Sequence, residues 1–411
     1  MFKRHVLRAA AMAAALLPAH SWATPLTFAQ ALDLAVQRSE AARSARAGAS
    51  SAVEAARAAG QLPDPILRAG VDNLPISGVD RLSTRDSMTM KRIGIGQEWL
   101  SAEKRAARQA AAEAMVGREA ASVQTTAAEV RLQTGLAYLD AYFAGEALKF
   151  TTRSEHHARE ELEAARARLS SASGSSQEVL GLASALGVAE DESAEVRQQG
   201  DAARAALERW VGTPVDDLAI PTSLSAPQEQ GYTASHPTVI AAQREVELAR
   251  KEADLARTNR TPNWSWELSY GQRAGYPDML SVGVSIPLTI APAQRQDREV
   301  ASKLALAEKA EAMLAEAMRM ATGEYRALAS DVKRLAERVE RYRASVLVPT
   351  RQRTAAALAS YSSNQVPLMT LFEARHAEVE AQRKLLSLQR DLAKAQAQLV
   401  LKPVQQEGRI Q

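Results

Sequence analysis

The sequence predicts a mainly α-helical protein with a small β part, built from two similar halves. Most of the chain is rich in Ala, Glu, Arg and Gln and has the texture of long helices. Two stretches, residues 66–99 and 264–288, instead alternate apolar and polar residues with a period of two, which is typical of paired strands. The order helix, hairpin, long helix, turn and shorter helix occurs twice, which indicates an internal duplication.

The N-terminus has the features of a secretory signal. Lys3, Arg4 and Arg8 precede the short apolar run Ala9–Leu17, and small residues stand where a signal peptidase would cleave after Ala23. The apolar run is too short for a spanning helix. We therefore assign residues 1–23 to a signal peptide; the alternative is a retained N-terminal anchor.

Charge and cysteine content exclude several classes of protein. The chain has 51 basic and 48 acidic residues, and the predicted signal holds three basic residues and no acidic one. The mature chain is thus balanced, which gives no reason to expect a nucleic-acid partner. Because there is no cysteine, the fold contains no disulfide and carries no lipid-bearing cysteine.

The first repeat is expected over residues 24–210. A helix over 26–60 should begin at the N-cap Thr27 and end before Pro63. The segments that follow are hairpin 66–99, long helix 101–169, a Ser/Gly turn and helix 177–210.

The second repeat is expected over residues 236–401, after a linker or equatorial segment at 211–235. Inside the long helix, Pro349 should cause a kink or a break. The segments are a first helix from residue 236, hairpin 264–288, long helix 293–360, helix 366–401 and a tail at 402–411.

Aromatic residues gather on the apolar faces of the hairpins. They are Trp99, Trp264, Trp266 and Tyr270, as expected for a membrane-interface girdle. Four strands alone leave two open edges, so several chains would have to close a barrel together. No segment after the signal reaches about 18 apolar residues, the length of a spanning helix. The alternative is a soluble sheet packed on helices.

These features resemble the TolC-like outer-membrane efflux proteins over essentially the whole mature chain. The resemblance rests on Leu26–Leu32, on the prolines Pro65 and Pro262 before the first and third strands, on Arg209–Gly212 and on the duplication. It implies a homotrimer with a 12-stranded β-barrel in outer-membrane lipid and a 12-helix α-barrel in the periplasm of a Gram-negative bacterium. It also implies a periplasmic adaptor (membrane fusion protein) and an inner-membrane RND pump as partners.

Three short segments are similar to the heavy-metal RND branch of this family, namely Leu62–Pro65, Asp72–Pro75 and Met88–Met90. The function expected from the resemblance is a passive exit duct for heavy-metal cations. One alternative keeps the duct but changes the cargo to drugs, organic solutes or a type I secretion substrate. Another is a periplasmic coiled-coil adaptor or structural protein without a pore.

The resemblance places a periplasmic aperture at Glu373 and Thr370, with Glu178 as the corresponding residue of the first repeat. Three copies of Glu373 would form a ring that attracts cations. The alternative is an ordinary solvated helix face.

Metal-binding residues are weakly indicated. Glu373 and His376 are three apart on one helix face, and Met88 and Met90 are soft donors two residues apart. A surface pair and packing methionines are the alternatives, so no resident metal and no cofactor is expected. The sequence has no P-loop, no nucleophile elbow and no dense His/Asp cluster, so we expect no enzyme.

The two helical turns are expected to contact the adaptor. Asn364 and Pro367 read as a helix start, and apolar side chains there are expected to be exposed. The proposed contact residues are Ser175, Ser176, Val179, Asn364, Val366, Pro367 and Leu368.

Overall fold

The structure is a computed structural model that describes residues 25–79, 81–171, 173–221 and 225–405. The predicted signal peptide lies outside the described residues, as do positions 406–411 of the predicted tail. The described chain forms two compact units. Each unit combines segments of both predicted repeats. The first holds the described parts of Met1–Gln37, Gln133–Leu224 and Leu335–Lys394, and the second holds those of Arg38–Leu132, Ser225–Arg334 and Ala395–Gln411.

The described chain is mainly helical with four strands, which confirms the predicted fold class. The first half contains α1 Phe28–Arg38, α2 Glu40–Ala59, β1 Ile66–Asp72, β2 Met90–Trp99, α3 Ala102–Ser170 and α4 Ser176–Val211. The second half contains α5 Glu229–Ala234, α6 Pro237–Thr258, β3 Trp264–Arg273, β4 Met279–Ser285, α7 Gln296–Tyr342, the π-helical turn Arg343–Leu347, α8 Val348–Ser362 and α9 Leu368–Leu401.

The predicted helix over 26–60 is in fact two helices. Ser39 has extended backbone angles between α1 and α2, and its hydroxyl accepts a hydrogen bond from the Ala42 N–H. This side chain satisfies a free N–H group at the start of α2, so the break costs little. The feature of the sequence that the prediction missed is an N-cap residue, Ser39, in the middle of an apolar helical pattern.

Pro349 interrupts the predicted helix over 293–360 only locally. It lies in the first turn of α8, directly after the π-helical turn Arg343–Leu347. A proline cannot donate to the carbonyl four residues earlier, and a π turn accommodates that missing bond without ending the helix. The predicted interruption of the helix near Pro349 is therefore confirmed. It takes the form of a π turn between two helices.

Asn364 ends a helix and does not begin one, contrary to the prediction. Its φ is 63°, in the left-handed region. Its N–H donates to the Tyr361 carbonyl at 2.9 Å, and the Gln365 N–H donates to the Ser360 carbonyl at 2.8 Å. Asparagine tolerates this conformation, so it closes α8, and α9 starts only after Pro367.

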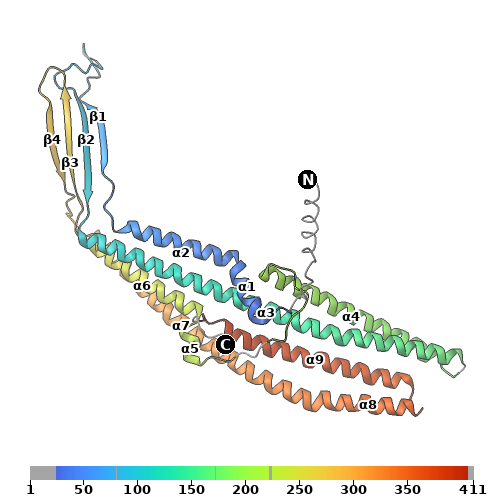
Figure 1. Cartoon of the computed structure of the whole chain (residues 1–411). Coiled ribbons are helices and arrows are strands. Elements are labelled where there is room, and N and C mark those ends of the chain that lie inside the picture. Colours follow the sequence, from blue (N-terminus) through green and yellow to red (C-terminus); the bar gives the residue numbers. More distant parts are fainter. Residues whose placement is uncertain (1–24, 80, 172, 222–224, 406–411) are drawn as a thin grey trace, which may run out of the picture. The chain divides into compact units, whose positions relative to one another are not determined.

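The four strands form one antiparallel sheet in the order β1-β2-β3-β4 (Figure 1). The two hairpins are joined by β2 and β3, which pair over ten residues from Met90↔Arg273 to Trp99↔Trp264. The fourth strand ends at Ser285, before the predicted Leu288, because Pro287 has no N–H and restricts the residue before it.

The predicted linker contains more order than expected. It includes the short helix α5, and Leu218 forms a parallel bridge with Leu26. The buried Tyr138 hydroxyl lies 2.7 Å from the carbonyl oxygens of both Leu26 and Ala219, which fixes this segment. None of the described helices combines the length and the apolar character needed to cross a membrane.

Candidate functional site

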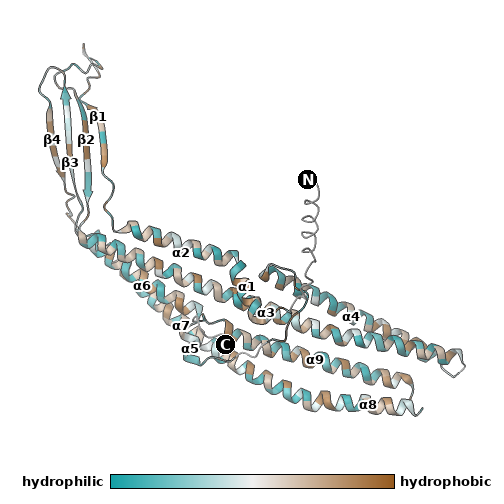
Figure 2. Ribbon diagram, viewed as in Figure 1, coloured by the Kyte–Doolittle hydropathy of each residue, from teal (hydrophilic) through white to brown (hydrophobic). Residues whose placement is uncertain are grey.

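One face of the four-stranded sheet is apolar and uncovered. Directly paired residues share a face, so Leu67, Ile95, Leu268 and Val282 form one row across all four strands. Their exposed fractions are 70%, 41%, 40% and 74%. Figure 2 shows apolar colour on parts of the strands, alternating with polar colour, and within the unit that contains the sheet no described helix lies over either of its faces. A soluble protein rarely leaves so continuous an apolar surface in water.

The predicted aromatic residues lie on this apolar face. Trp99 and Trp264 are cross-strand partners whose ring centroids are 6.0 Å apart. Trp266 and Tyr270 follow on β3 at alternate positions, and Tyr270 is paired with Ile93. The alternation predicted the shared face correctly, and the register adds that the two tryptophans sit side by side at the helix-proximal end of the strands.

Both outer strands of the sheet have an unpaired edge. Among the described residues, β1 pairs only with β2 and β4 only with β3. Such an edge presents free N–H and C=O groups in a row, which is a template for another strand. The chain therefore offers two complementary edges beside an exposed apolar face.

The opposite face of the sheet is polar and rich in glycine. Arg68 on β1 reaches over β2 and pairs with Glu267 on β3 at 2.5 Å. The crossing is possible because Gly94 carries no side chain: a Cβ there would lie 2.6 Å from the Ser269 Cβ. The sequence showed a polar face but gave no indication of this long-range pair.

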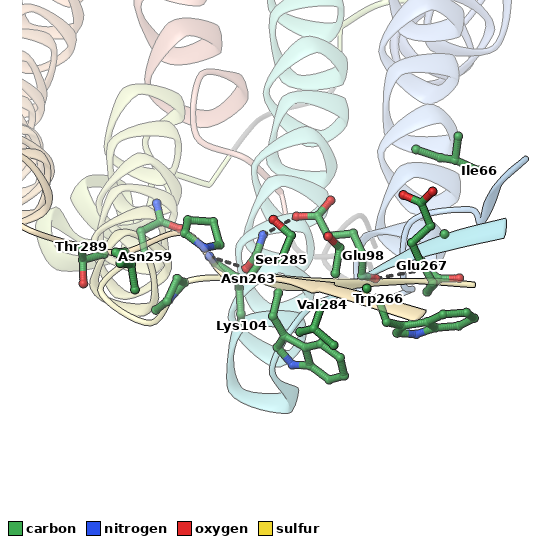
Figure 3. A pocket seen from close by; sticks show the side chains of 18 of the residues that line it. Ile66, Glu98, Lys104, Asn259, Asn263, Trp266, Glu267, Val284, Ser285 and Thr289 are labelled. Carbon is green, nitrogen blue, oxygen red and sulfur yellow. Dashed lines mark hydrogen bonds between the residues drawn. The ribbon is translucent and has the colours of Figure 1, made fainter. Parts of the chain in front are cut away.

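A polar hollow of about 780 Å³ lies where the strands meet the helices. Figure 3 shows a chain of hydrogen bonds there: Lys104 donates to the Asn263 side-chain oxygen at 2.9 Å, and the Asn263 amide donates to Glu98 at 2.7 Å. Burial lowers the pKa of Lys104, with a further contribution from Arg108. These bonds link the end of β2, the start of β3 and the start of α3.

At the helical turns, Glu178 is engaged in capping. Ser175 caps α4 by accepting from the Gln177 N–H at 3.1 Å. One Glu178 oxygen accepts from the Leu368 N–H, the first residue of α9, at 3.1 Å and lies 3.8 Å from Arg168. The carboxylate thus supplies the cap that we expected from Asn364, and it ties the two turns together.

The expectation of exposed apolar side chains at the turns is wrong for Leu368. It is 2% exposed and belongs to a buried cluster with Leu182 and Leu371, against which Val179 packs half-buried. Its position at the start of α9 faces the first turns of α4, which explains the burial. An exposed apolar residue that the prediction missed is Leu180, at 71%.

Glu373 remains available on the surface of α9. It is exposed, and it forms no hydrogen bond or ion pair within the described part of the chain. Thr370 is half-buried one turn earlier. His376 stacks on Phe372 with 5.9 Å between ring centroids, so its ring packs along the same helix. Among the described residues, no hydrogen bond or ion pair joins His376 to Glu373.

The structure gathers no metal site from the predicted donors. The described residues contain no group of three or more His, Cys, Asp or Glu side chains that could hold a metal ion. Met90 lies over Gly271, where its sulfur fills the space of a missing Cβ. Met88 is exposed, at 66%, in the loop before β2.

A buried ion pair lies between α3 and α9, at residues that the sequence did not single out. Glu161 is 5% exposed and is paired with Arg375. Burial raises the pKa of Glu161, although Arg375 opposes this shift. Its second oxygen has no described hydrogen-bond partner and lines a small cavity of about 170 Å³ with Phe150 and Phe372.

A second polar cluster holds the segment after α9. The buried His236 lies 3.3 Å from Glu324, and Lys402 donates to the other oxygen of Glu324 at 2.5 Å. The Val404 N–H donates to the Ser235 carbonyl at 2.8 Å. Burial lowers the pKa of His236, although Glu324 opposes this shift.

We predict that acid loosens this C-terminal segment. The unfolded state takes up a proton near pH 6.5 that the buried His236 resists, so the free energy of unfolding falls as the pH drops below about 6.5. In a Val404→Cys variant, the introduced cysteine is the only one in the chain. Relative to the labelling rate of free cysteine at the same pH, labelling of this thiol should accelerate as the pH falls from 7.5 to 5.5. Adding His236→Gln should remove this acceleration, and adding His156→Gln, at an exposed site, should not. Equal pH dependence in all three variants would contradict the prediction.

Comparison with known proteins gives a consistent picture at the level of fold. No protein-family model matches the sequence, and no curated protein sequence matches it. Solved structures do match, among them the outer-membrane protein VceC of Vibrio cholerae, with 16% identity and a TM-score of 0.74 over 92% of this chain and 96% of that one.

Two further solved channel structures are about as similar to this chain. The open-state outer-membrane channel MtrE of Neisseria gonorrhoeae is 15% identical, with a TM-score of 0.76 over 91% of this chain and 88% of that one. CusC, described for its transmembrane channel formation, is 13% identical, with a TM-score of 0.73 over 91% of each chain. At these identities the likeness establishes the fold that the chain shares with outer-membrane channels.

Proposed function

We propose that this chain, which has the fold of outer-membrane channels, is the passive outer-membrane exit duct of a tripartite efflux system. The observation that carries the proposal is the four-stranded sheet, with an uncovered apolar face, a polar face and two unpaired edges. Three copies placed edge to edge would pair β4 of each with β1 of the next and close a 12-stranded barrel, an even number as in outer-membrane barrels generally. The apolar face would then meet lipid and the polar face would line the lumen.

The long helices support the periplasmic part of this proposal. The helix α3 has 69 residues, which corresponds to a length of about 100 Å at 1.5 Å per residue. The helices beside the sheet follow the order of the strands: α2 contacts α3 through Gly48, α3 contacts α6 through Arg118, and α6 contacts α7 through Arg250. A helical tube continuing each copy's share of the barrel is therefore consistent with the packing.

Membrane fractionation combined with native mass spectrometry tests the assembly. We expect the full-length protein in the outer-membrane fraction of a Gram-negative host, with the mass of three processed chains. A monomer in the periplasmic fraction would overturn the proposal and would favour the adaptor alternative.

Heavy-metal cations are the cargo that we propose, on the strength of the sequence resemblance around Leu62–Pro65 and Met88–Met90. Deleting the gene and scoring sensitivity to monovalent and divalent metal ions beside a panel of drugs decides this point. Sensitivity to metals alone supports the proposal. Sensitivity to drugs alone, or loss of a secreted polypeptide, assigns the alternative cargo.

The turn ends are the proposed adaptor surface and aperture. Leu180 joins Ser176 and Val366 there as an exposed or half-buried residue that a partner helix can cover. Because Glu178 is occupied by capping, we assign the aperture charge to Glu373, with Thr370 beside it.

Glu373→Ala is the test of the aperture. Three carboxylates in a ring attract cations, so the variant should lose cation preference and block by polyvalent cations in single-channel recordings. Glu380→Ala, at another exposed glutamate of α9, is the control and should leave both unchanged. Unaltered selectivity in Glu373→Ala would refute the assignment.

A further inference from the structure

One charged side chain, that of Lys91, lies on the apolar face of the four-stranded sheet. The register places Lys91 on this face, with Val71 on one side and Gln272 on the other. Every other residue of this face in the four strands is uncharged. Lys91 is exposed and has no ion-pair partner among the described residues, whereas its neighbour Arg92 points to the opposite face and pairs with Asp72 at 2.6 Å.

The position of Lys91 relative to the tryptophan pair is informative. Lys91 and Trp99 are both on β2, and the eight residue steps from one to the other correspond to about 26 Å along the strand at 3.3 Å per residue. Because barrel strands are tilted by about 35–45°, this length spans roughly 20 Å of the membrane normal, which is most of the apolar band of about 25 Å. Between these levels the face of β2 holds Ile93, Ile95 and, next to the tryptophans, Gln97. Lys91 therefore lies near one boundary of the apolar band and the tryptophans lie near the other.

The chemistry at the Lys91 level suits a phosphate group. The ammonium has three donors, and the Gln272 side-chain amide on the adjacent strand adds two more. The next row of the same face, toward the helices, holds Ile93 and Tyr270, which form an apolar surface suited to acyl chains. The carboxylate of Asp278 accepts a hydrogen bond from the Tyr270 hydroxyl, and no ion pair joins it to Lys91 among the described residues.

We propose that Lys91 and Gln272 form a binding site for a lipid phosphate group at the membrane boundary far from the helices, where the outer leaflet of an outer membrane supplies the phosphates of lipid A. This site rests on the proposed function, because it requires the apolar face to meet lipid. The lysine stem lies along apolar surface while its ammonium binds the phosphate at the interface, as long basic side chains do in membranes. Three copies would carry three equivalent sites around the barrel.

Lipid retention by the full-length trimer tests the site. Detergent-solubilised protein is mixed with lipid A or with dephosphorylated lipid A, and lipids retained per trimer are counted by native mass spectrometry. The wild type should retain lipid A in preference to its dephosphorylated form. Lys91→Gln should reduce that retention about fivefold, as expected for one interfacial cation, while Lys91→Arg should preserve it.

A matched variant and the trimer mass make the outcomes separable. Lys251→Gln removes an exposed lysine from α6, outside the sheet, and should leave lipid retention unchanged. Equal retention of the two lipids by the wild type, or unchanged retention in Lys91→Gln, would overturn the lipid phosphate site while the trimer mass still supported the proposed function. Absence of a membrane-inserted trimer in the wild type would instead overturn the proposed function.

Discussion

Replacing Gly94 by valine is expected to abolish the membrane-inserted trimer. A Cβ atom at position 94 would lie 2.6 Å from the Ser269 Cβ and 3.0 Å from the Leu268 carbonyl oxygen. Both are on β3, the strand that joins the second hairpin to the first. Because neighbouring strands on both sides hold this backbone, the clash is relieved only by separating β2 from β3.

Gly283 provides the matched control for this prediction. It lies on the same polar face, on β4, and a Cβ there would have no neighbour within 4 Å. Outer-membrane trimer, measured by fractionation and native mass spectrometry, should fall at least tenfold in Gly94→Val and stay near the wild-type level in Gly283→Val. Equal trimer yields from the two variants would show that the β2–β3 pairing is not what limits assembly.

Removing Arg375 is expected to destabilise the unit that contains the helical turns by about 3–5 kcal/mol at neutral pH, the usual cost of leaving a buried partner charge unpaired. Glu161 is almost fully buried, and Arg375 is its ion-pair partner. In Arg375→Met the carboxylate remains in an apolar setting between α3 and α9. Denaturant unfolding of the full-length protein, followed by the helical circular-dichroism signal, measures the loss.

The pH dependence identifies the cause of this loss. Without Arg375, the folded-state pKa of Glu161 rises further above its unfolded value, so the folded state binds the extra proton. The destabilisation should therefore be largest above the raised pKa and shrink as the pH falls toward 5. The double variant Glu161→Met with Arg375→Met should be close to the wild type, because an apolar pair can replace a buried ion pair.

An exposed ion pair of α3, the helix that also carries Glu161, serves as the comparison. Arg159 lies 3.1 Å from Glu190, and both side chains are about half exposed. Arg159→Met should cost less than about 1 kcal/mol, as exposed ion pairs do. A similar loss in Arg159→Met and Arg375→Met would contradict the assignment of the effect to burial.

The local elements were largely readable from the sequence. The period-two alternation placed all four strands, and the mixed helical texture placed α3 within one residue at each end. Where prediction failed, a single side chain had decided the outcome: the Ser39 hydroxyl divides the first helix, Asn364 takes a left-handed conformation, and Pro287 shortens β4. These are cap and turn effects, in which a side chain competes with the repeating backbone pattern.

Only part of the candidate site could be predicted from the sequence. The aromatic face followed from alternation, because side chains on a strand point to opposite faces in turn. The burial of Leu368, the capping by Glu178 and the Glu161–Arg375 pair did not follow, since each depends on which helix lies opposite. Charge and spacing along one helix carry no information about that neighbour.

The sequence by itself determined the helices, the two hairpins and their duplicated order, because period, proline and glycine act over a few residues. Only the tertiary structure decided that β2 pairs with β3, and that Arg68 reaches Glu267 across Gly94. The physical reason is that these relations join residues far apart in the chain. Their register is set by the packing of both hairpins together, which no local pattern encodes.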